Sequence, residues 1–546
     1  MNRRQTTILQ LALILAAWVS LFAPNLGNDG LWFQGDAPRH AANGLFWKAF
    51  LSHGSVNPRD FALQYYARYP VIAPANYPPF FYLLEAGAYT LFHPSPYAAR
   101  ALVAIFALMA ALYLFAWLRR WVGEEAGWMA ALLLLLPGFI IWSNAVMLNI
   151  PAAALSLAAL YHARRWIEAP PGREPGLHFY LAAGLSLLAV LTYYPAGALM
   201  AVVFAWILAF RRLPQILNGK TALLGFTAAA LLALIVYVAH AWAPEHLSFV
   251  TQGFHQAGDP LPALVLYFLE LPRLMGYPIL ILSLCGVAVG TCRRRWRSES
   301  LWLILFFLSV YAAMTWLRAK SPRYVLLLCI PLLCFAAIAF ESFTEWLATR
   351  IHSRRISKGA AASAMGILCV AQAWIAFSTP VPRVEGVKEA VAFLEKVAPD
   401  EPVFFDGYHD GIFTFYLCAR DPDYKRQVVL GSKLLYTSAV DTTWRYRAFI
   451  NSTADVVEAF RDRGGCRWLA IERSRQVNAI PAARLLRKAL EFPEFELVRS
   501  VPASGDDMEA IDIYRFKPAV RAVTEIELPF HGLGEGVSFK IRPVEK

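Results

Sequence analysis

Residues 98–120 read AARALVAIFALMAALYLFAWLRR, an apolar run that ends in a pair of arginines. A helix needs about 20 apolar residues to cross the hydrocarbon core of a bilayer, and basic residues gather at its cytoplasmic end. The stretch therefore predicts a membrane-spanning helix whose C-terminal end faces the cytoplasm. The number of such stretches along the chain predicts the number of membrane spans.

Further apolar stretches of this kind predict about eleven spans in all. The one long stretch at 178–210 is divided at Tyr194-Pro195, because proline interrupts a helix. The predicted spans are 7–24, 98–118, 126–143, 147–163, 178–192, 195–210, 222–241, 265–290, 301–317, 324–342 and 360–378. The expected fold class is a polytopic α-helical membrane protein.

Composition and charge agree with this fold class. The 546 residues are 58% hydrophobic and only 16% charged, whereas soluble chains carry about 25% charged residues. A soluble enzyme, a disordered chain and a fibrous protein are therefore excluded. The net charge of +12 lies in the hydrophobic part, since residues 1–379 carry +13 and residues 380–546 carry −1. Such a distribution indicates membrane topology rather than nucleic-acid binding.

Basic clusters between alternate pairs of spans predict the orientation. They hold 18 of the 27 Lys and Arg residues of 1–379, so the loops that contain them are expected in the cytoplasm. The clusters are Arg3/Arg4, Arg119/Arg120, Arg164/Arg165/Arg173, Arg211/Arg212/Lys220, Arg293–Arg295 with Arg297, and Arg350/Arg354/Arg355/Lys358. The N-terminus is then cytoplasmic and the C-terminal domain lies outside.

The predicted organisation is a membrane domain, 1–379, followed by an exported α/β domain, 380–546. Within the first, 25–97 forms an external loop with helices at the membrane interface over 38–51 and 79–92. In the second, the predicted elements are helices Val387–Val397 and Ala454–Arg463 and strands Val403–Phe405, Trp468–Ile471, Leu497–Val501 and Ile511–Phe516. Cys418 and Cys466 are its two cysteines, and a disulfide between them is one alternative.

Candidate functional residues lie on the external side. Arg318, Lys320 and Arg323 place three cations in six residues directly before a span, where they are suited to a lipid phosphate or to ordinary solvation. Asp36 follows the first span and precedes an interfacial helix. Two interpretations of it stay open and are compatible: a helix N-cap before Pro38, or a catalytic base.

The chain resembles the GT-C membrane glycosyltransferases, in particular protein O-mannosyltransferases and lipid A aminoarabinose transferases. An acidic motif in the first external loop is matched by Gly35–Ala41, and a following Pro-Pro aromatic motif by Asn76–Leu83. Further matches are Ala98-Ala99-Arg100 before the next span and Arg323-Tyr324 with Pro331. The resemblance covers about residues 1–345.

The chain departs from the family's motifs at three positions. Ala37 replaces the second acid of the acidic motif, and Asn149 stands where a second Asp is usual. Tyr193 replaces a lysine that ends another span. These changes leave Asp36 as the chief catalytic candidate. No ligand set for a divalent metal or other cofactor is found, so a metal requirement stays open.

The resemblance implies a membrane glycosyltransferase that moves a sugar from a polyprenyl-phosphate donor to an acceptor hydroxyl, with inversion and with Asp36 as base. The acceptor would be a protein, a lipid or a glycan, in protein glycosylation or lipopolysaccharide modification at the bacterial cytoplasmic membrane. The implied donor-phosphate residues are Arg323, Lys320, Arg100 and Arg318, and the implied substrate-binding residues are Arg39, His40, Tyr77, Tyr82, Asn149 and Tyr324.

Two further alternatives stay open. A non-enzymatic carrier or flippase for a polyprenyl lipid would use the same cations but has no need of Asp36. In the exported domain, the run Phe404–Asp410 is either a strand end followed by a turn or part of an acceptor site.

Overall fold

The computed structural model describes residues 3–32, 36–54, 58–72, 77–169, 176–210, 260–316, 320–351, 353–439, 445–505 and 507–520. By their contacts the residues form two compact units. Among the described residues, the first contains those of 3–26, 101–210 and 260–381, and the second contains those of 27–100 and 382–520. The first external loop therefore belongs to the same unit as the C-terminal domain, and a domain boundary at Thr379 stays a prediction.

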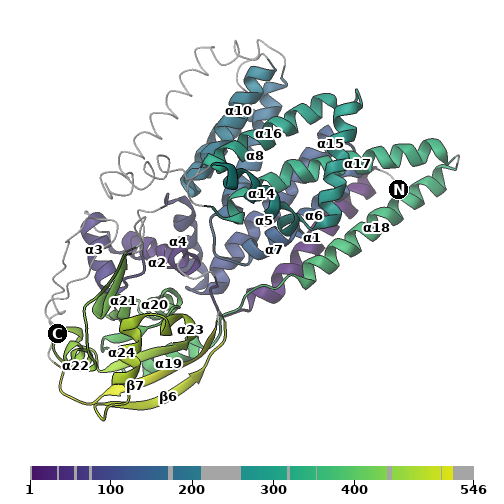
Figure 1. The fold of residues 1–546 in the computed structure, drawn as a ribbon. Helices are drawn as coiled ribbons and strands as arrows, with labels where there is room; N and C mark the ends of the chain where they lie inside the picture. The colour runs from purple at the N-terminus through teal and green to yellow at the C-terminus, as the bar shows by residue number, and fades with distance from the viewer. Residues whose placement is uncertain are drawn as a thin grey trace. The chain divides into compact units, whose positions relative to one another are not determined.

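The first unit is built from long apolar helices at the predicted spans (Figure 1). They are α1 (Arg3–Leu26), α5 (Pro96–Trp121), α8 (Asn149–Ile167), α9 (Leu177–Thr192), α10 (Ala198–Ala209), α16 (Arg297–Trp316), α17 (Cys329–Arg350) and α18 (Arg354–Ser378). The predicted break at Tyr194-Pro195 is a 3-10 turn, η2 (Tyr194–Gly197). The predicted span 222–241 lies outside the described residues.

In the described part of the chain, five helices are long and apolar enough to cross a bilayer, or seven if two bent pairs are counted. Helices of this length and composition confirm a multi-pass membrane protein. The number of eleven spans stays a prediction.

At two predicted spans the structure has a bent pair of helices instead of one continuous helix. Within 126–143, η1 (Glu125–Met129) and α6 (Ala130–Leu134) are followed by α7 (Pro137–Ser143) after a bend of 48°. Within 265–290, α14 (Pro260–Met275) and α15 (Tyr277–Cys292) meet at 118°. The causes are local: Pro137 cannot continue the preceding helix, and Gly276 takes a φ of +78° that favours glycine.

The C-terminal part of the second unit is an α/β domain around a five-stranded sheet. Its strands are β1 (Val403–Asp406), β2 (Val428–Leu430), β5 (Trp468–Ser474), β6 (Phe495–Pro502) and β7 (Met508–Phe516), in the order β2-β1-β5-β7-β6. The first three strands of this order are parallel, β7 pairs antiparallel with β5, and β6 pairs antiparallel with β7. All four predicted strands and both predicted helices are confirmed, with α19 at Val387–Val397 and α22 at Thr453–Glu458 continued by a π-helical turn.

The external loop contributes three helices to the same unit: α2 (Ala37–His53), α3 (Pro58–Arg68) and α4 (Phe80–Phe92). The helices expected over 38–51 and 79–92 are thus present. Helix α2 packs against α4 and also against α20 (Asp410–Ala419) of the α/β domain. Cys418 of α20 lies 2.8 Å from the hydroxyl of Tyr65 and is not bonded to Cys466, so the disulfide alternative is not supported.

Candidate active site

Asp36 occupies the N-cap position of α2, and its own carbonyl oxygen accepts the backbone N–H of His40 at 2.8 Å. Pro38 lies in the first turn, where its missing N–H costs nothing. The Asp36 side chain makes no capping hydrogen bond. The N-cap interpretation is therefore correct for the position, but the half-buried carboxylate does not act as the cap.

One turn further along α2, His40 is buried against two tyrosines. A hydrogen bond of 2.7 Å joins its Nδ1 atom to the hydroxyl of Tyr82. The ring centroids of His40 and Tyr77 are 5.0 Å apart. Four of the predicted residues, Asp36, His40, Tyr77 and Tyr82, are thus brought together by α2 and the start of α4.

Behind this group lies Glu85, which the sequence analysis did not place in the site. Its side chain is fully buried, and neither carboxyl oxygen has a hydrogen-bond partner among the described residues. Burial raises the pKa of Glu85 well above its usual range. A sequence signal existed: Tyr82, Glu85 and Tyr89 recur at helical spacing on the buried face of α4.

Arg39 points to a different set of groups. It is half-buried on α2 and lies within electrostatic reach of Asp410 at the start of α20. Burial raises the pKa of Asp410 to about 6, and the positive charges of Arg39 and Lys433 oppose that rise. The role of Arg39 as a substrate ligand stays a prediction.

The first unit holds the predicted cation cluster. Arg323 lies in the 3-10 turn η3 (Pro322–Leu328), nine-tenths buried, with its guanidinium 5.3 Å from the Tyr324 ring centroid and 5.9 Å from that of Trp142. Its Nη1 is 3.9 Å from Sδ of Met147, two residues before Asn149. The structure therefore brings the Arg-Tyr motif and the Asn149 motif together.

Lys320 precedes the same turn. Its Nζ donates to the carbonyl oxygen of Thr315 at 2.5 Å and lies 5.9 Å from the ring centroid of Tyr267. Sequence reasoning missed Tyr267 and Trp142, because a single aromatic residue in an apolar helix carries no signal of its own. Arg318 lies outside the described residues.

Arg100 is found in the second unit at the start of α5. It is buried, and its Nη1 donates to the carbonyl oxygen of Gly30 at 2.5 Å. In the described parts of the chain, no group of three or more His, Cys, Asp or Glu side chains could hold a metal ion. The metal requirement accordingly stays open.

The run Phe404–Asp410 forms the end of β1 and the turn into α20, as one of its two interpretations predicted. Its polar groups pair within the domain. Asp406 forms an ion pair with Arg487, and Glu472 accepts from the backbone N–H of His409 at 2.8 Å. Acceptor binding by this run stays a prediction.

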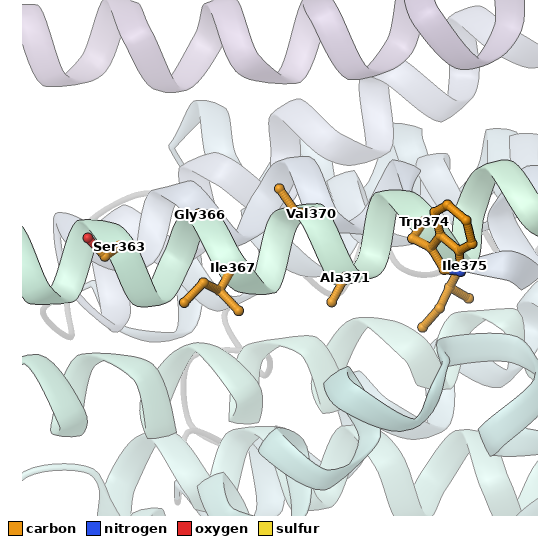
Figure 2. Close-up of a pocket in the computed structure, with 7 residues that line it drawn as sticks. All are labelled: Ser363, Gly366, Ile367, Val370, Ala371, Trp374 and Ile375. Carbon is orange, nitrogen blue, oxygen red and sulfur yellow. The ribbon is translucent and has the colours of Figure 1, made fainter.

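An apolar pocket lies along one face of α18 (Figure 2). Its lining comes from this helix alone and includes the exposed side chains of Ile367, Val370 and Trp374. None of the predicted site residues lines it. An apolar surface of this kind on a membrane helix is suited to contact with hydrocarbon chains and not to a catalytic role.

Comparison with known proteins finds one family model and several similar folds. Residues 64–250 match the family model of dolichyl-phosphate-mannose-protein mannosyltransferases. The fold is similar to that of ArnT from Cupriavidus metallidurans bound to undecaprenyl phosphate, with a TM-score of 0.61 and 15% identity over 93% of this chain and 97% of that one. It is also similar to the archaeal oligosaccharyltransferase AglB from Archaeoglobus fulgidus, in complex with an inhibitory peptide and a dolichol-phosphate. There the TM-score is 0.51, with 12% identity over 85% of this chain and 69% of that one.

No curated protein matches the chain. The fold is therefore similar to that of these membrane transferases, and the family match is to the mannosyltransferase model over residues 64–250.

Proposed function

We propose that this protein transfers a sugar from a polyprenyl-phosphate donor to an acceptor hydroxyl, with Asp36 as the general base. The observation that carries the proposal is the placement of Asp36. It is an acid at the N-cap of α2 whose side chain is not used for capping, one turn from the His40–Tyr82 pair. The undecaprenyl phosphate bound to the ArnT structure supports a lipid-phosphate donor.

In the proposed step, the carboxylate of Asp36 takes the proton of the acceptor hydroxyl as its oxygen attacks the anomeric carbon. The bond from that carbon to the donor phosphate breaks, and its electron pair leaves on the phosphate. Attack opposite the leaving group inverts the anomeric configuration. A positioned general base contributes about 10²- to 10⁴-fold in rate.

The departing phosphate gains negative charge, which cations stabilise. Arg323, which is buried, and Lys320, which is half-buried, are the described candidates, and both lie next to aromatic rings. Charge stabilisation is strongest where water is excluded, and one such donor is typically worth about 3–4 kcal/mol. Tyr324, whose ring lies beside the Arg323 guanidinium, and Asn149, two residues after the Arg323 neighbour Met147, are proposed to line the donor site with it.

The proposed location is the bacterial cytoplasmic membrane, with the N-terminus in the cytoplasm and the C-terminal domain outside. The distribution of basic residues supports this orientation. Lipid-linked donors then reach the site from the outer leaflet, and the acceptor is a protein, a lipid or a glycan of the envelope.

The test uses the full chain in lipid nanodiscs with a panel of synthetic polyprenyl-phosphate monosaccharides and crude envelope as acceptor. Release of free polyprenyl phosphate is followed for the wild type and for Asp36→Asn. We expect release with one donor that falls by at least 100-fold in Asp36→Asn, while donor binding persists.

A matched control is Asp60→Asn, an exposed acid of α3 in the same loop, which should leave the rate unchanged. Full activity in Asp36→Asn overturns the role of Asp36. Donor binding without release from any acceptor pool favours a lipid carrier instead.

A further inference from the structure

A junction around Asp29 ties the start of the external loop to the C-terminal domain. Nζ of Lys388, on α19, lies 3.0 Å and 3.1 Å from the two carboxylate oxygens of Asp29. The hydroxyl of Tyr97 donates to the same carboxylate, and the hydroxyl of Tyr416, on α20, donates to the Asp29 carbonyl oxygen. Asp29 is seven residues before Asp36.

The backbone of the next residue, Gly30, is also held in place. Arg100 donates from Nη1 to the carbonyl oxygen of Gly30 at 2.5 Å. A Cβ atom added at Gly30 would lie 2.0 Å from the carbonyl oxygen of Val384, so the two backbones approach as closely as only glycine allows. The backbone at Gly30 thus has a single position against the domain.

Beyond α2, the loop is held a second time. The hydroxyl of Tyr65 lies 2.8 Å from Sγ of Cys418, and the hydroxyl of Tyr69 donates to Asp421 at 2.5 Å. All these side chains except Asp29, Tyr97 and Lys388 are buried. Helix α2 packs on α20 between these two anchors.

We propose that the C-terminal domain positions the segment that carries Asp36, with the Asp29 junction as its fixed point, and that Arg100 is a positioning residue. This inference rests on the proposed function and adds a role for the domain to it. The arrangement explains why Arg100 is turned to a backbone carbonyl. It also predicts that Lys388, which takes no part in the chemical step, has a measurable effect on the transfer rate.

The Lys388–Asp29 pair is suited to a test because it is partly exposed, with side-chain exposures of 38% and 32%. Removing such a pair has little effect on folding. A displacement of about 1 Å at a reacting group, by contrast, costs about 100-fold in rate. Loss of the pair should therefore change catalysis far more than it changes thermal stability.

The experiment compares Lys388→Met with Lys388→Arg in the full chain in nanodiscs. For Lys388→Met we expect kcat to fall about tenfold, with less than a twofold change in the KM for the donor. Amide hydrogen exchange of residues 37–53 should become faster. Lys388→Arg keeps the charge and should restore both readouts, and Lys396→Met, on an exposed position of the same helix, should change neither.

Unchanged exchange in 37–53 together with unchanged kcat in Lys388→Met overturns the inference. An equal loss in Lys388→Arg and Lys388→Met does so as well, because the charge would then be irrelevant. If the wild type transfers no sugar from any donor, the proposed function fails. The exchange measurement still decides whether the junction positions α2.

Discussion

Glu85 lies on α4 with its carboxyl group buried beside Gly44 and Tyr89. A Cβ atom added at Gly44 would be 2.9 Å from its Oε2 atom, so the acid occupies all the space that the absent side chain leaves. Burial without a charged partner favours the neutral acid. Glu85 is thus a buried acid, with its pKa raised by burial, in the loop that carries the proposed base.

A group whose pKa is raised in the folded state stabilises the protein below its unfolded pKa and loses that contribution as the pH rises through the folded pKa. The neutral isostere Glu85→Gln lacks this dependence. We predict that the Tm of Glu85→Gln exceeds that of the wild type at pH 8 and that the difference shrinks on acidification towards pH 5. Thermal unfolding in nanodiscs across this range measures it.

The exposed acid Glu389, on α19, provides a control, since Glu389→Gln should show a much smaller change of this kind with pH. A Tm difference between Glu85→Gln and wild type that is the same at every pH would contradict the burial argument.

The hydrogen bond between His40 and Tyr82 gives a second prediction. Tyr82→Phe removes the hydroxyl at 2.7 Å from Nδ1 of His40, which is 2% exposed. Depriving a buried polar atom of its partner costs about 1–3 kcal/mol. We expect a lower Tm and a transfer rate reduced by about tenfold, measured by release of polyprenyl phosphate.

Tyr89→Phe on the same helix is the matched control, because its hydroxyl makes only a long bond of 3.3 Å to the Ala41 carbonyl oxygen. Equal effects of the two substitutions would show that the His40–Tyr82 bond has no special role.

At the scale of the elements, one side chain of α18 forms hydrogen bonds at the breaks of both bent spans. Gln372 is fully buried, and its Nε2 donates at 3.0 Å both to the carbonyl oxygen of Leu135, at the end of α6, and to that of Met275, at the end of α14. A break in a membrane helix frees backbone groups that water cannot reach. Gln372 satisfies one such group at each break.

We predict that Gln372→Leu lowers the free energy of unfolding by about 2–6 kcal/mol, since it leaves two buried carbonyl oxygens without this donor at about 1–3 kcal/mol each. Thermal unfolding in nanodiscs checks it, with Ile367→Ala, on the exposed face of α18, as a control of small effect. A Tm unchanged in Gln372→Leu would mean that the broken helices are stabilised by other contacts.

At the scale of the whole molecule, the basic clusters predict which parts face which side. Asp423, in the C-terminal domain, and Arg294, between α15 and α16, are both exposed. In a variant without the seven native cysteines, we expect Asp423→Cys to react with an impermeant maleimide in intact spheroplasts. Arg294→Cys should react only after permeabilisation. The reverse pattern would invert the proposed topology.

The sequence alone determined the fold class, most span positions and the elements of the C-terminal domain. Each follows from local periodicity: runs of about 20 apolar residues, alternation in strands, and proline at breaks. The placement of Asp36 before a helix, and of Tyr82 on another, was predictable in the same way. Where a glycine decided the backbone, as at Gly276, the predicted continuous span was wrong.

Only the tertiary structure decided which of these residues meet. It joined His40 to Tyr82, turned Arg100 to Gly30, and tied Asp29 to Lys388 across 359 positions of the chain. It also left Glu85 without a polar partner among the described residues. The physical reason is that periodicity fixes the face of an element on which a side chain lies, whereas its partner comes from another element whose packing no local pattern encodes.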